Sequence, residues 1–64
     1  MKTKQEMIDD CLVLIAKHND LAKEKGQQEI SAAYYKALFR KAKKCYIGVC
    51  SNLILNKINS LKNF

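Results

Sequence analysis

Residues 45–56 read CYIGVCSNLILN and contain no charged side chain. Five cations fall within the nine residues directly before this stretch: Lys36, Arg40, Lys41, Lys43 and Lys44. In a chain of 64 residues, an apolar stretch of this kind needs a surface to pack on, and a group of cations needs an anionic partner. The uncharged stretch therefore decides the fold, and the cations before it indicate how the protein associates.

The length of the chain predicts one helical domain that spans residues 1–64. A domain of this size buries only about 60% of the surface that its unfolded chain exposes, so extra stabilisation is expected. Three cysteines, one histidine and no CxxC motif make a disulfide framework or a metal site a poor explanation. We expect free thiols, no metal, no cofactor, and stabilisation by self-association.

The odd number of cysteines, with no export signal at the start of the sequence, predicts a cytoplasmic protein. The first ten residues, MKTKQEMIDD, lack the apolar segment of a signal peptide. The uncharged run at 45–56 is shorter than the roughly 20 residues that span a bilayer. A membrane-surface helix would carry cations and apolar residues on opposite faces, whereas here cationic 36–44 precedes apolar 45–61 along the chain. We therefore expect no membrane partner.

The first half of the chain has clear helix signals. There is no proline, and the only two glycines are Gly26 and Gly48. Thr3 and Glu6 have the spacing of a capping box, and Gly26 suits a left-handed helix end. Apolar residues recur between them at steps of three and four. These signals predict a helix over about residues 3–25.

No strong stop follows Gly26, so the pattern predicts a second helix over about residues 29–62. Its apolar residues form two adjacent stripes, of which packing on the first helix would use only one. We expect an all-α antiparallel helical hairpin. Residues 53–64 would then project beyond the first helix by about 18 Å.

This projecting segment favours assembly of hairpins into an oligomeric helical bundle, because its large apolar side chains would otherwise stay exposed. The alternative is a break near Gly48 that folds the segment back as a third helix. The predicted oligomer or partner interface consists of Tyr46, Val49, Cys50, Leu53, Ile54, Ile58, Leu61 and Phe64.

The charge distribution is uneven. Residues 1–26 contain five lysines and five acids, whereas residues 27–64 contain seven cations and only Glu29. Cations one helical turn apart can contact successive phosphates, and nearby aromatic rings can stack on bases. The predicted anion-binding residues are Lys36, Arg40, Lys41, Lys43, Lys44, Tyr35 and Phe39.

Catalysis is not expected. His18 has no acid three or four residues away to orient it, and no nucleophile is placed beside it. We therefore expect a small, non-enzymatic, self-associating regulator that binds a nucleic acid or a nucleotide. The alternative is an adaptor or inhibitor, of viral or mobile-element type, that docks on a foreign protein through the apolar stripe of the second helix.

Overall fold

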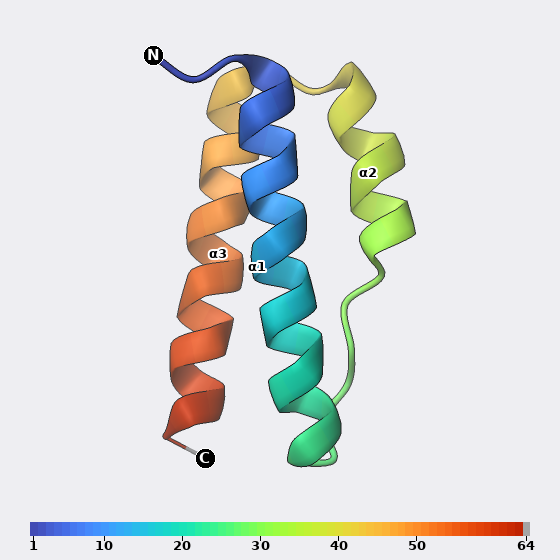
Figure 1. Cartoon of the computed structure of the whole chain (residues 1–64), viewed down its shortest axis with the longest axis vertical. Helices are drawn as coiled ribbons and strands as arrows, with labels where there is room; N and C mark the ends of the chain where they lie inside the picture. Colours follow the sequence, from blue (N-terminus) through green and yellow to red (C-terminus); the bar gives the residue numbers. More distant parts are fainter. Residues whose placement is uncertain (64) are drawn as a thin grey trace.

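The computed structural model describes residues 1–63 of the chain, and in this range all regular structure is helical, as the sequence predicts. The helices are α1 (Lys4–Glu24), α2 (Ala32–Lys41) and α3 (Lys44–Lys62). Figure 1 shows α1 between the other two, with α2 antiparallel to it and α3 parallel to it. The Cα atoms extend over 33 × 21 × 14 Å, so the helices form a flat arrangement.

The predicted ends of the first helix are confirmed. The Thr3 hydroxyl accepts a hydrogen bond from the Glu6 N–H (3.1 Å), and the Glu6 carboxylate accepts one from the Thr3 N–H (3.0 Å). This reciprocal bond lowers the pKa of Glu6. At the other end Gly26 has φ +67°, and the Gln27 N–H donates to the Ala22 carbonyl (2.8 Å). This is the glycine-based helix stop that the sequence indicates.

An extended segment, residues 27–31, leads from α1 to α2, and a side chain of α1 holds it in place. The Asn19 amide accepts from the Ile30 N–H (2.8 Å) and donates to the Ile30 carbonyl (2.8 Å). Both backbone groups of Ile30 are therefore satisfied without a neighbouring strand. One residue on, the Ser31 hydroxyl accepts from the Tyr34 N–H (3.2 Å) and caps α2.

The prediction of one continuous second helix is wrong. Ala42 (φ −86°, ψ 157°) and Lys43 (φ −85°, ψ 159°) are extended, and they separate α2 from α3. Gly48, the alternative break point, lies inside α3. The third helix considered in the sequence therefore exists, but it begins at Lys44.

Two physical effects account for a break at this place. In an unbroken helix Arg40 would face Lys44 at i+4 spacing, and a like-charge pair of this kind costs about 0.2–0.5 kcal/mol. The larger effect is burial, because each large apolar side chain that α3 packs against α1 gains about 1.5–3 kcal/mol. The buried large apolar residues of α3 are Ile47, Ile54, Ile58 and Leu61.

The core lies mainly between α1 and α3, where Cys11, Ile15 and Ile47 are completely buried. From α2 the fully buried side chain is Phe39. Because α3 lies along α1, residues 53–62 do not project beyond the first helix, contrary to the hairpin prediction. The antiparallel pair is α1 with the short α2 (Figure 1).

The position of Gly48 inside α3 makes a direct prediction. A Cβ atom added there would have the Met7 methyl group as its nearest neighbour, at 3.9 Å, which is ordinary van der Waals contact. Gly48→Ala should therefore raise the free energy of unfolding by about 0.5–1 kcal/mol, the helix-propensity difference between the two residues. Urea denaturation followed by circular dichroism measures it. A loss of stability would contradict a helix that runs through residue 48.

Candidate anion-binding end

One end of the bundle is formed by the start of α1, the end of α2 and the start of α3 (Figure 1). Lys41 is the last residue of α2, Lys43 precedes α3, and Lys44 is its first residue. Lys4 is also there, since its ammonium group donates to the Arg40 carbonyl (3.1 Å). We call this region the anion-binding end, after the anion binding that the sequence predicts for its residues, and its cations are Lys4, Arg40, Lys41, Lys43 and Lys44.

The cations of this end have no carboxylate partner among residues 1–63. The ion pairs in that range join Lys2 to Asp10 and Lys23 to Glu29. The acidic side chains of α1 are exposed, and residues 32–62 contain seven cations and no acid. The positive charge of α2 and α3 is therefore left for solvent or for a partner.

The first turn of α3 adds to this positive potential. No side chain caps it, because Lys43 in the capping position makes no side-chain hydrogen bond, and its first turn contains no acid. Lys43 and Lys44 thus lie beside the positive end of the helix dipole, where cations are unfavourable and anions are favourable. An anion bound near this turn would offset the repulsion.

Four aromatic rings join α2 to the start of α3. Ring centroids are 5.4 Å apart for Tyr34–Tyr35, 5.7 Å for Tyr35–Phe39 and 6.4 Å for Phe39–Tyr46. Phe39 has no exposed surface and Tyr35 is half-buried, whereas Tyr34 is 62% and Tyr46 is 43% exposed. Of the two rings predicted to contact a ligand, Phe39 is instead an anchor of the core. The rings that a ligand can reach best are Tyr34 and Tyr46.

Two shallow hollows place these rings beside the cations. One, of about 440 Å³, is lined by Leu38, Lys41, Ala42, Lys43, Cys45 and Tyr46. The other, of about 430 Å³, is lined by Tyr34, Ala37, Leu38, Arg40 and Lys41. Because Leu38 and Lys41 belong to both, the hollows are contiguous. The structure thus gathers three predicted cations around an apolar strip, while Lys36 and Lys44 are exposed but line neither hollow.

Tyr46 remains a neutral phenol in this site. A hydrogen bond between its hydroxyl and the Cys50 thiol raises its pKa, and the nearby Tyr34 and Tyr35 raise it further. A neutral ring beside Lys43 adds no negative charge that would repel an anion. The geometry therefore combines positive side chains with two flat, uncharged surfaces.

The predicted interface residues are divided by the fold. Tyr46, Val49 and Leu53 are exposed along α3, at 43%, 56% and 56%, and we call them the apolar stripe. Phe64 lies outside the described residues. The other four side chains pack inside the chain: Cys50, Ile54, Ile58 and Leu61.

The cysteines differ in their access to solvent, which predicts their reactivity. Cys45 is exposed beside the first hollow, whereas Cys11 and Cys50 are buried. Burial also raises the pKa of the Cys11 thiol, so it forms less of the reactive thiolate. Iodoacetamide should modify the native protein once, at Cys45, and the urea-unfolded protein three times. Mass spectrometry after proteolytic digestion identifies the modified cysteines. Fast modification of Cys11 in the native protein would contradict the packing of α1 on α3.

Comparison with models of protein families, with curated proteins and with solved structures finds no match for this chain. No helix within residues 1–63 is long and apolar enough to cross a membrane. The same residues contain no group of three or more histidine, cysteine or acidic side chains that could hold a metal ion.

Proposed function

We propose that the protein is a non-enzymatic regulator that binds a nucleic-acid strand at the anion-binding end. The observation that carries the proposal is the grouping of Arg40, Lys41 and Lys43 with the exposed rings of Tyr34 and Tyr46. The cations would contact successive phosphates and the two rings would stack on bases. Both interactions are independent of base sequence.

A single strand fits this surface better than a duplex does. The hollows are shallow and the two tyrosines are separate rings on α2 and α3. Only unpaired bases have free faces for such stacking, which contributes about 1–3 kcal/mol per base. A duplex would offer the cations its phosphates but would leave the tyrosines without a partner.

Fluorescence anisotropy with a labelled single-stranded oligothymidylate tests this proposal over a series of salt concentrations. If three cations displace counterions, the logarithm of the binding constant should fall with the logarithm of salt with a slope of about −2. A duplex of the same length should bind more weakly. Absent binding at low salt, or binding that salt does not change, would contradict the proposal.

A second proposal is that two copies of the chain pack together through the apolar stripe. Val49 and Leu53 are one helical turn apart, with Tyr46 one turn before Val49, so the three form a continuous exposed row. The stripe lies in the uncharged stretch 45–56, which lets two copies approach without repulsion between like charges. Burial of the stripe in a dimer would also add stability that a small domain needs, because such a domain buries a smaller fraction of its own surface than a large one does.

Val49→Lys tests this second proposal, and Val13→Lys is a matched control because Val13 lies on α1 with a similar exposure, 54% against 56%. Light scattering over a concentration series should show a dimer for the parent chain and for Val13→Lys, and a monomer for Val49→Lys. A monomeric parent chain would overturn the dimer and leave the stripe as a docking site for a foreign protein.

A further inference from the structure

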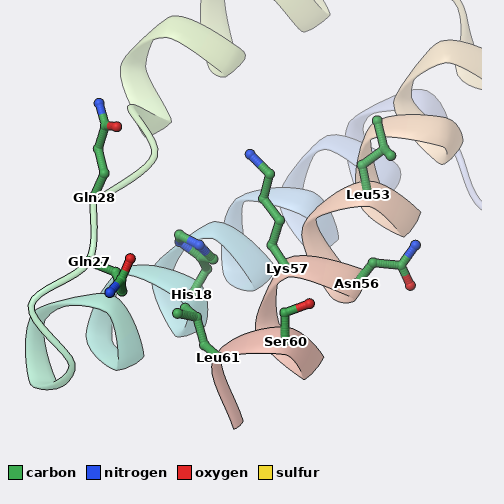
Figure 2. A pocket seen from close by; sticks show the side chains of 8 residues that line it. All are labelled: His18, Gln27, Gln28, Leu53, Asn56, Lys57, Ser60 and Leu61. Carbon is green, nitrogen blue, oxygen red and sulfur yellow. The ribbon is translucent and has the colours of Figure 1, made fainter. Parts of the chain in front are cut away.

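A third hollow, of about 480 Å³, lies away from the anion-binding end (Figure 2). The extended segment supplies one side of it, α3 the other, and α1 contributes His18 between them (Figure 2). Its lining residues are His18, Gln27, Gln28, Leu53, Asn56, Lys57, Ser60 and Leu61. Its volume is in the range of small-molecule sites.

Hydrogen bonding fixes the proton on His18. Asn19 must point its oxygen at the Ile30 N–H, because a backbone N–H can only donate (2.8 Å). The same oxygen lies 3.1 Å from His18 Nδ1, so Nδ1 must carry a proton and donate it. In the neutral ring Nε2 is then a lone-pair acceptor.

The acceptor nitrogen of His18 is left for a ligand. The side chain is only 5% exposed, and Nε2 has no hydrogen-bond partner within residues 1–63. No fully buried side-chain nitrogen or oxygen in that range lacks a partner, so Nε2 must be reachable from outside. His18 is one of the residues that line the third hollow. A buried imidazole thus lines an open hollow, and it has one acceptor nitrogen that no group within residues 1–63 uses.

The rest of the lining defines what would bind there. Lys57 is exposed and has no carboxylate partner among the described residues, so it can receive an anionic group. The amides of Gln27, Gln28 and Asn56 can donate or accept, and Leu53 offers an apolar contact. Among residues 1–63, no acidic side chain lines the hollow.

We propose that this hollow binds a small organic anion that also carries an N–H or O–H donor. The donor would bind His18 Nε2 and the anionic group would bind Lys57. A mononucleotide and a hydroxycarboxylate share this chemistry. The site is separate from the anion-binding end and does not depend on the function proposed for that end.

The single histidine of the chain makes the test specific. In a protein labelled with ¹⁵N-histidine, long-range proton–nitrogen NMR spectra contain one imidazole, and they should show the Nδ1–H form before any ligand is added. Adenosine monophosphate and malate are then titrated separately. Adenosine, which lacks the anion, and acetate, which lacks a donor beside its anion, are the controls.

A saturable shift of the Nε2 signal with either test anion supports the proposal, and the one that acts identifies the source. Lys57→Gln should weaken that binding by roughly tenfold or more, as expected for a lost charged contact. Lys62→Gln, which removes the same charge from the last turn of α3, should leave it unchanged. An Nε2–H form in the free protein would overturn the proposal, and so would an imidazole signal that does not respond to millimolar adenosine monophosphate or malate. Equal binding of adenosine or acetate, or a Lys57→Gln variant that binds the anion as tightly as the parent chain, would overturn it too.

Discussion

Phe39→Ala should lower the free energy of unfolding by about 3–5 kcal/mol, the usual result of truncating a buried phenylalanine. Small domains have only about 5–15 kcal/mol in total, so the variant should be largely unfolded near physiological temperature. The reason is specific to α2. Its ten residues are fewer than an isolated helix needs for stability, and Phe39 is its one buried side chain.

Tyr34→Ala provides the matched control for this prediction. It removes an aromatic ring from the same helix, but that ring is 62% exposed and its described ring contact is to Tyr35. Its stability should stay within about 0.5–1 kcal/mol of the parent chain. Urea denaturation followed by circular dichroism compares the two variants. Equal losses would contradict the assignment of Phe39 as the anchor of α2.

The double variant Lys41→Glu with Lys43→Glu should weaken binding of a single-stranded oligonucleotide on the order of a hundredfold. Each lost charged contact accounts for roughly tenfold, and the new carboxylates would repel phosphates in addition. The fold should persist, because both side chains are exposed and an acid at Lys43 would suit the positive end of the α3 dipole.

The control for charge alone is Lys17→Glu with Lys62→Glu, which makes the same change in net charge away from the anion-binding end. Fluorescence anisotropy at low salt should show that this variant retains most of the parent affinity. If both double variants lose affinity equally, binding follows net charge and no particular surface is responsible.

The ends of α1 are predictable from sequence because their signals are local. Thr3 and Glu6 satisfy each other within one turn, and Gly26 provides the left-handed residue at the stop. The break after Lys41 has no such signal. Neither Ala42 nor Lys43 is a helix breaker, and what favours the break is burial of α3 against α1, a contact between distant parts of the chain.

The candidate site could be predicted only in part for the same reason. The cations are visible as a cluster in the sequence, but which rings accompany them depends on how α2 packs. Phe39 and Tyr34 are five residues apart and lie on different faces of α2, so the face of α2 that packs on the core decides that the first is buried and the second exposed. On the other side of the break, Tyr46 of α3 lines the same hollow as Leu38 and Lys41 of α2.

The hollow around His18 is harder to predict from sequence patterns than the anion-binding end is. The apolar periodicity of α1 places His18 on its buried side, as observed. Its free acceptor arises because Asn19 holds Ile30 eleven residues later. That contact depends on the path of the extended segment, which has no periodic pattern to reveal it.

The most direct test of the proposed function is a map of backbone amide shifts in the ¹⁵N-labelled protein on addition of the single-stranded oligothymidylate. We expect the largest changes on residues 40–46 and on Tyr34, where the cations and the exposed rings meet. Residues around Lys62 and on the acidic outer side of α1 should change little. Changes concentrated on α1, or on Val49 and Leu53 alone, would contradict binding at this end of the bundle.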